Sequence, residues 1–136
     1  MTGRHVLLVD DEQDIRDLVS IWLHDDPRCS DVAEAGDLDI AVRLVTAQRP
    51  DAILLDFFLG RRLCIEVLPA IRALVPHALI VVYTASRRAA ESAGALAAGA
   101  DYIVEKGSIS VDDVVELLLG DELIAARERR AQSPGA

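Results

Sequence analysis

The sequence is poor in cysteine, in basic residues and in long apolar segments. Its only cysteines, Cys29 and Cys64, are far apart and form no CxxC pair, so we expect small buried hydrophobic side chains in a reducing compartment. Acidic residues outnumber basic ones by 23 to 14, and the formal net charge of −9 argues against nucleic acid and anionic membranes as partners. We find no signal peptide and no membrane-spanning stretch, and therefore expect a soluble cytoplasmic protein.

What is present suffices for one domain with a hydrophobic core, since 51% of the 136 residues are hydrophobic. Short apolar runs of strand length recur along the chain without any longer internal repeat. The clear runs are Val6–Val9, Ala52–Leu55, Leu79–Tyr83 and Tyr102–Val104, and a weaker one lies near Asp31–Ala35.

Between these runs lie segments with the 3.6-residue apolar period of helices. The expected helices are Gln13–Leu23, Leu38–Gln48, one within Leu63–Val75, Arg87–Ala98 and one opened by Ser110. The third should begin late, near Glu66, or be kinked, because Pro69 is tolerated only in a first helical turn. We expect Asp11 to cap the first helix. The residues expected to face inward from that helix are Ile15, Leu18, Val19 and Trp22.

Strands that read as continuous apolar runs, each followed by a helix, predict a parallel sheet covered on both faces. Five such units make a doubly wound α/β fold, a (βα)5 three-layer sandwich. We assign residues 1–119 to this domain and residues 120–136 to a C-terminal extension, helical over Asp121–Arg130 and frayed at its end.

Polar residues stand at the carboxyl ends of four of the five expected strands. They are Asp10 and Asp11 after the first strand, Asp56 after the third, Thr84 after the fourth and Lys106 after the fifth. Each alone has an ordinary structural explanation as a helix cap, a strand end or a surface charge. Together they favour function, because the carboxyl ends of parallel strands meet at one edge of the sheet, where ligands bind. Lys106 is also the only lysine in the chain, which suggests a geometric need for an ammonium there.

Three carboxylates in a small site repel one another unless a cation is present. Mg²⁺, a hard ion with oxygen ligands, is the natural occupant of such a site. A carboxylate beside the metal can attack phosphorus and form an aspartyl phosphate, whose oxygens the metal and an ammonium would neutralise. A hydroxyl one strand away can then bond the new phosphoryl group, which makes a switch.

This set of motifs resembles a response-regulator receiver domain of two-component signalling over about residues 4 to 119. The matching features are the acidic pair, Asp56, the Thr84–Ala85 pair after the fourth strand, and Gly99-Ala-Asp101 followed by Lys106. The resemblance implies a flavodoxin-like sheet with strand order 2-1-3-4-5. It also implies that the fourth helix, fifth strand and fifth helix form a switched protein-interaction surface.

The resemblance also implies a role for each site residue. Asp56 would be the phosphoacceptor, Thr84 the switch hydroxyl, and Lys106 the group that contacts the phosphoryl oxygens. Mg²⁺ would be held by Asp10, Asp11 and Asp56, with the backbone carbonyl of Phe58 as a further ligand. The phosphoryl donor would be a sensor histidine kinase or a histidine phosphotransfer protein. A downstream protein or a second copy of the chain would be the recipient of the signal.

The sequence departs from the family pattern at several positions. Ile103 stands where the family usually has an aromatic switch residue, and the neighbouring Tyr102 should point to the opposite face of the sheet. Gly107 follows Lys106 where the family often has a proline. The loop after Asp56 has Gly60 and Cys64 at positions where the family usually has proline and glycine, so we expect that loop to have a different shape.

We expect a stand-alone receiver without a DNA-binding output domain, because only 17 residues follow Leu119. Its chemistry would be limited to self-catalysed phosphoryl transfer and slow dephosphorylation, so it would not be an enzyme with a separate substrate. Two other functions stay open. A haloacid-dehalogenase-like phosphatase needs a second Asp where this chain has Phe58. A degenerate receiver would serve as a phosphorylation-independent docking or dimerisation module.

Overall fold

Five parallel strands form the central sheet of the computed structural model, which describes residues 3–120. Their spatial order is β2-β1-β3-β6-β7, so the predicted order 2-1-3-4-5 is confirmed for the strands of this sheet, counted along the chain. Their bounds are β1 Arg4–Val9, β2 Cys29–Ala35, β3 Ala52–Asp56, β6 Leu79–Thr84 and β7 Tyr102–Glu105. The predicted helix Asp121–Arg130 and the tail after it lie outside the described residues.

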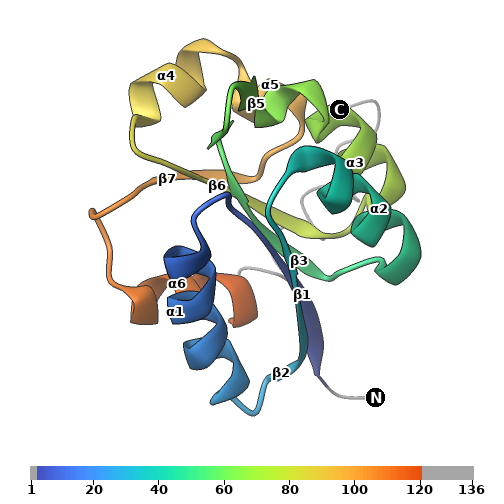
Figure 1. The fold of residues 1–136 in the computed structure, drawn as a ribbon, viewed down its shortest axis with the longest axis vertical. Helices are drawn as coiled ribbons and strands as arrows, with labels where there is room; N and C mark the ends of the chain where they lie inside the picture. Colours follow the sequence, from blue (N-terminus) through green and yellow to red (C-terminus); the bar gives the residue numbers. More distant parts are fainter. Residues whose placement is uncertain (1–2, 121–136) are drawn as a thin grey trace.

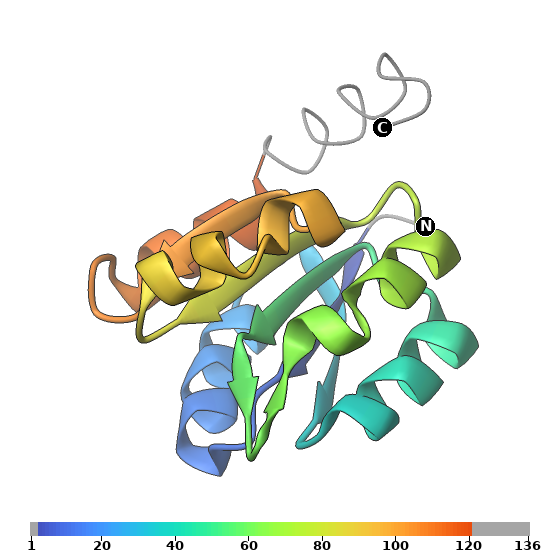
Figure 2. The same cartoon turned by 90° about the horizontal axis from the view of Figure 1, so that it is seen from above.

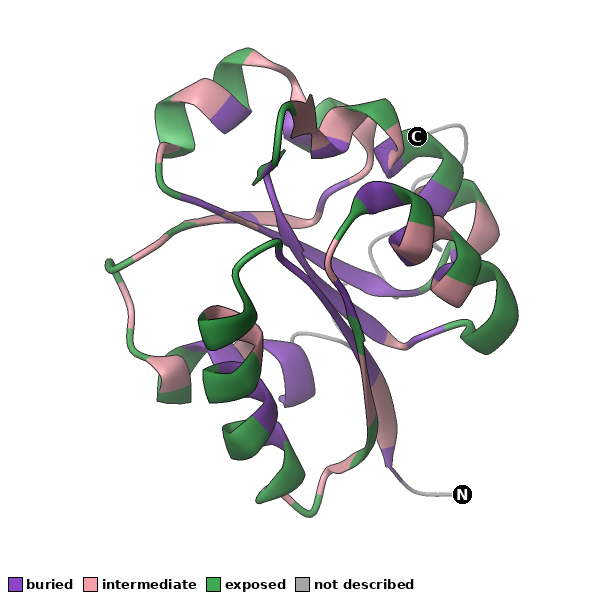
Figure 3. Ribbon diagram, viewed as in Figure 1, coloured by how far each residue is buried: buried purple, intermediate pink, exposed green. Residues whose placement is uncertain are grey.

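Helices cover both faces of the sheet, as Figures 1 and 2 show. One face carries α1 (Gln13–His24) and α6 (Val111–Leu119). The other carries α2 (Leu38–Gln48), α3 (Leu68–Leu74), α4 (Arg87–Ser92) and α5 (Ala95–Ala98). Each layer encloses its own hydrophobic core, and the central strands between the layers are buried along most of their length (Figure 3). The three-layer α/β fold predicted from the sequence is therefore confirmed.

Side-chain caps set where several helices begin. The Asp37 carboxylate accepts a hydrogen bond of 2.8 Å from the Ile40 amide at the start of α2. Ser110 and Asp113 form a reciprocal capping box at the start of α6, which ends at Gly120.

The segment after Leu63 is a 3₁₀ turn over Cys64–Glu66 followed by α3, with Pro69 in the first turn of α3. The late start predicted for that helix is thus confirmed.

The predicted inward face of α1 is confirmed for Val19 and wrong for Leu18 and Trp22. Leu18 and Trp22 are each 44% exposed, whereas Val19 and Leu23 are buried. Two adjacent apolar stripes are compatible with a 3.6-residue period, and the i, i+4 stripe through Val19 and Leu23 is the one that packs against the sheet. The predicted Asp11 cap was also wrong, since the N-cap residue is Glu12 and makes no side-chain cap bond.

Two further expectations needed correction. The alanine-rich helix predicted over Arg87–Ala98 is divided into α4 and α5 at Gly94, whose φ of +78° is left-handed and does not continue a helix. The loop predicted after Asp56 is an antiparallel hairpin of β4 (Phe58–Leu59) and β5 (Arg62–Leu63), turning at Gly60 with φ +60°.

Both cysteines are free thiols; Cys64 is buried as expected and Cys29 is half-buried. Among residues 3–120, no helix is long and apolar enough to span a membrane.

Candidate functional site at the carboxyl edge of the sheet

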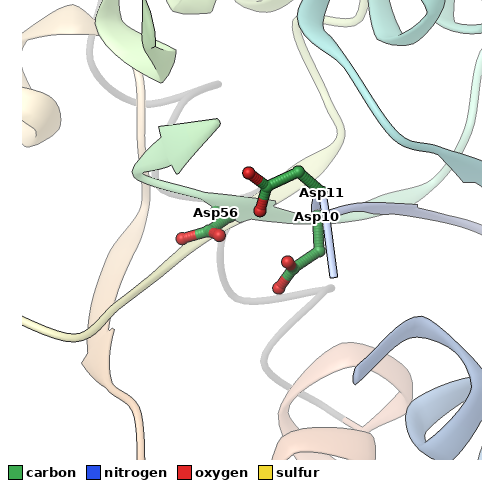
Figure 4. Close-up of side chains that lie close together, drawn as sticks. All are labelled: Asp10, Asp11 and Asp56. Carbon is green, nitrogen blue, oxygen red and sulfur yellow. The ribbon is translucent and has the colours of Figure 1, made fainter. Parts of the chain in front are cut away.

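Asp10, Asp11 and Asp56 lie together where β1 and β3 end. Val9 pairs with Leu55 across these parallel strands, so the residues that follow them emerge side by side. One carboxylate oxygen from each of the three aspartates lies within 4.8 Å of the others (Figure 4). Asp10 and Asp56 are only 5% exposed, whereas Asp11 is exposed. The structure thus gathers three oxygen donors, a set suited to a hard divalent cation such as Mg²⁺.

Lys106 joins this cluster from the end of β7. Its Nζ lies 3.2 Å from Oδ2 of Asp56 and 3.3 Å from Oδ2 of Asp10. The exposed Glu12 carboxylate is 3.8 Å away. The Lys106 amide donates a 2.7 Å hydrogen bond to the Thr84 carbonyl, which fixes the backbone at this point. The ammonium is therefore held between two buried carboxylates.

The crowded carboxylates alter the protonation of Asp56. Burial, followed by the charge of Asp10, raises the pKa of Asp56 to about 7, although the Lys106 ammonium and a hydrogen bond from the Phe58 backbone oppose the rise. Burial disfavours the Lys106 charge, but the Asp56 and Asp10 carboxylates outweigh it and raise the pKa of the ammonium. Without a metal ion, the single ammonium of Lys106 therefore does not balance the negative charge of the clustered carboxylates. A divalent cation would supply the missing positive charge.

This pKa makes a testable prediction about stability. The folded protein binds the Asp56 proton more tightly than the unfolded chain, so metal-free protein should lose stability as the pH rises through the interval between the ordinary value of 3.8 and about 7. At about pH 8 in chelator, Asp56→Asn should therefore be more stable than wild type by on the order of 2 kcal/mol, and the gain should shrink at about pH 5.5. Urea unfolding at both pH values measures it.

Mg²⁺ provides the control for this prediction. Because it would bind the ionised folded site, Mg²⁺ should stabilise wild type at about pH 8 and have less effect on Asp56→Asn. A stability difference between the two proteins that does not change with pH would contradict the assignment of the raised pKa to Asp56.

Thr84 and Asp11 are engaged with the backbone. Thr84 is fully buried; its hydroxyl donates to the Ser86 carbonyl (3.2 Å) and accepts from the Ser86 amide (3.1 Å). Ser86 in turn caps α4, because its hydroxyl accepts a hydrogen bond from the Ala89 amide. Asp11 accepts a 2.9 Å hydrogen bond from the Gly60 amide, which ties the end of β1 to the β4–β5 hairpin. Each predicted site residue therefore lies at or beside the carboxyl edge of the sheet. The Thr84 hydroxyl, however, is bonded to the backbone of Ser86 rather than to the carboxylates.

Two residues at the site were missed by sequence reasoning. Arg16 donates to the Asp10 carbonyl at 2.6 Å and to Glu34 at 3.1 Å, so it braces the backbone next to the carboxylates. Tyr83 pairs with Asp56 across β3 and β6, and its ring centroid is 5.5 Å from Nζ of Lys106. The alternation of side chains along β6 was a usable signal for Tyr83, because it places that ring on the face opposite Thr84.

The departures from the family pattern are visible in the packing. Ile103 is buried in the core beneath α2–α5, while Tyr102 packs against the core beneath α1 and α6. The prediction that these two side chains point to opposite faces is thus confirmed. Phe58, two residues after Asp56, is 44% exposed, and its ring meets that of Phe57 edge-on with the ring centroids 4.7 Å apart.

Comparison with known proteins agrees with this geometry. A family model described as the response regulator receiver domain matches residues 6–118. The chain belongs to the response regulator receiver family. Among curated relatives, the receiver domain is 36% identical over 110 residues to protein-glutamate methylesterase/protein-glutamine glutaminase 1 of Syntrophus aciditrophicus, covering 79% of this chain and 31% of the relative. The first curated relatives matched are all much longer than this chain, which spans between 25% and 37% of their length.

Solved receiver structures share the fold. A CheY-like receiver domain protein from Methanospirillum hungatei aligns with a TM-score of 0.82 at 21% identity, covering 94% of this chain and 99% of the other. A response regulator protein from Burkholderia pseudomallei, crystallised with a phosphorylated aspartic acid, a calcium ion and citrate, aligns with a TM-score of 0.77 at 23% identity. That alignment covers 97% of this chain and 76% of the other.

Proposed function

We propose that this receiver domain accepts a phosphoryl group on Asp56 from the phosphohistidine of a sensor histidine kinase or of a phosphotransfer protein in the cytoplasm. The observation that carries the proposal is the cluster itself: three aspartate carboxylates within 4.8 Å and the Lys106 ammonium 3.2 Å from Asp56. The Burkholderia pseudomallei protein of the same fold contains a phosphorylated aspartic acid and a calcium ion, which supports the proposal.

The residues divide the work of the transfer. An ionised Asp56 oxygen attacks phosphorus; the phosphorus–nitrogen bond to the donor imidazole breaks, and its electron pair remains on the imidazole. Lys106 turns toward the oxygens of the phosphoryl group, where an ammonium neutralises developing charge. Asp10, Asp11 and Asp56, with the Phe58 carbonyl, would hold Mg²⁺, which when bound screens the repulsion between carboxylate and phosphoryl group.

Release of Thr84 from its turn provides the switch in this proposal. For the Thr84 hydroxyl to donate a hydrogen bond to the phosphoryl group, it must give up the bond that it donates to the carbonyl of Ser86, the residue that caps α4. Phosphorylation is thereby coupled to the start of α4 and to the surface formed by α4, α5, β7 and α6. A downstream protein or a second copy of the chain would bind that surface. We assign the function to residues 1–119.

The test is the intact mass of the protein after incubation with acetyl phosphate and Mg²⁺. We expect the mass to rise by one phosphoryl group, and chelation of the metal to prevent the rise. No gain with acetyl phosphate or with a phosphorylated phosphotransfer protein would contradict the proposal.

One observation favours a second function, docking without phosphorylation. Ile103, a side chain that cannot replace the usual aromatic switch, is buried in the core beneath α2–α5. In a docking module, the oligomeric state and partner binding would be the same with and without phosphate on Asp56. Size-exclusion chromatography of both forms separates the two functions.

Phe58 is expected to prolong the phosphorylated state. Its exposed ring stands two residues after Asp56, where a large apolar group would shield an acyl phosphate from water. Phe58→Asn should therefore lose phosphate several-fold faster than wild type, whereas Phe58→Leu, which keeps an apolar side chain, should remain slow. The decay of phosphoprotein after removal of the donor measures both rates. Equal rates for Phe58→Asn and wild type would mean that Phe58 only covers the core.

A further inference from the structure

Tyr83 occupies a position next to the phosphoacceptor that the proposed mechanism leaves without a role. In the pairing of β3 with β6, Tyr83 is the direct partner of Asp56, and its carbonyl accepts a 3.2 Å hydrogen bond from the Phe57 amide. Partners in a parallel pair share a face, so the ring lies on the same side of the sheet as the Asp56 carboxylate. The half-buried ring also packs against the core beneath α1 and α6, which holds it in place.

The ring faces the lysine as well. Nζ of Lys106 lies 5.5 Å from the Tyr83 ring centroid, within the range of a cation–π contact. Burial, assisted by the charges of Asp10 and Asp56, raises the pKa of Tyr83 against the opposing effect of Lys106. The phenol therefore stays neutral near pH 7, and the ring keeps the electron-rich face that attracts an ammonium.

Lys106 needs such a guide because its carboxylate partners compete. The carboxylates of Asp56, Asp10 and Glu12 lie 3.2, 3.3 and 3.8 Å from Nζ of Lys106. The flexible four-carbon side chain of lysine lets the ammonium move among them. Salt bridges alone therefore do not fix the ammonium at the acceptor. When Asp10 binds a metal ion, it is also lost as a partner for the lysine. The ring contact involves neither carboxylate, so binding of a metal ion to Asp10 would not remove it.

We propose that Tyr83 is a positioning residue whose ring face holds the ammonium of Lys106 at Asp56, where phosphoryl transfer takes place. The proposal rests on the function proposed above and adds a residue to it. In this receiver the aromatic side chain near the site is then Tyr83 on β6, in contact with the lysine. The position on β7 where the family usually has an aromatic residue is occupied by Ile103.

The single lysine makes the contact directly observable. Protein labelled with ¹³C-lysine has one side-chain ε-methylene signal, that of Lys106, because no other lysine is present. In wild type we expect a nuclear Overhauser effect between this methylene and the Tyr83 ring, and a chemical shift displaced by the ring current. Tyr83→Phe should keep the displaced shift, and Tyr83→Leu should lose it. Tyr102→Leu removes the only other tyrosine, which packs in the same core, and should leave the Lys106 signal in place.

Rates of phosphorylation by acetyl phosphate with Mg²⁺ test the consequence. Loss of the ring should slow Tyr83→Leu by about three- to tenfold, the size expected for a cation–π contact, while Tyr83→Phe stays within about twofold of wild type. Tyr102→Leu reports what loss of packing alone does to the rate. Equal slowing in Tyr83→Leu and Tyr102→Leu, or slowing in Tyr83→Phe as large as in Tyr83→Leu, would overturn the role of the ring.

The two proposals fail in different ways. If wild type takes up no phosphate but shows the ring-shifted lysine signal, the proposed function is wrong and the positioning of the ammonium holds. If wild type is phosphorylated but its lysine signal shows no contact with the ring, the positioning role is wrong and the function holds. The wild-type Overhauser measurement gives this answer even if Tyr83→Leu fails to fold.

Discussion

Asp56→Asn is expected to abolish uptake of a phosphoryl group while leaving the fold intact. The amide has no anionic oxygen to attack phosphorus, and no other carboxylate in the described cluster occupies the same position at the end of β3. The fold should survive because the substitution removes a buried carboxylate that the charge of Asp10 repels, and leaves a side chain of nearly the same shape. Intact mass after incubation with acetyl phosphate and Mg²⁺ should show no phosphorylated protein.

Asp51→Asn is a matched control at the opposite end of the same strand. Asp51 accepts a 2.9 Å hydrogen bond from the His5 amide, and the oxygen of an asparagine can still accept it. This variant should therefore be phosphorylated like wild type. Phosphorylation of Asp56→Asn at a rate similar to that of Asp51→Asn would show that another residue is the acceptor.

Lys106→Met is expected to slow phosphorylation by about 10²-fold, the cost of removing one charged donor from a buried site. Among residues 3–120, Lys106 is the only cationic side chain that pairs with Asp56. The methionine keeps much of the length and apolar bulk of the lysine side chain. The decrease in rate therefore reports the loss of the ammonium group. Phosphoprotein formation over time, measured at saturating Mg²⁺, gives the rate.

Two further measurements sharpen the result for Lys106. The variant should bind Mg²⁺ more tightly, because Lys106 no longer competes for the Asp10 and Asp56 oxygens. Lys106→Arg should stay at least about tenfold slower than wild type, since a broad guanidinium does not replace a compact ammonium between two carboxylates. Full activity in Lys106→Arg would show that charge alone, and not its placement, is required.

Much of this site was predictable from the sequence because parallel, doubly covered strands read as uninterrupted apolar runs. Such a run ends where the strand leaves the core, and the next residue emerges at the ligand-binding edge. Asp10, Asp56 and Lys106 could be placed at a common edge on that basis alone. Their distances from one another required the strand register, which the sequence does not specify.

The features that sequence reasoning did not find depend on packing between elements. The inward face of α1 was predicted correctly at Val19 but wrongly at Leu18 and Trp22, because this helix contains two apolar stripes and packing against the sheet and α6 selects one. Asp11 was expected to cap a helix, yet its carboxylate bonds the Gly60 amide in a hairpin 49 residues away. Local propensity carries no information about partners so distant in the chain.

Identification of the phosphorylated residue tests the central proposal most directly. Phosphoprotein formed with acetyl phosphate and Mg²⁺ is reduced with borohydride, which converts an aspartyl phosphate to homoserine, and the modified residue is located by peptide mass spectrometry. We predict homoserine at position 56 and unmodified aspartate at positions 10 and 11. Homoserine at either of those two positions, or its absence from position 56 in protein that carries phosphate, would contradict the account.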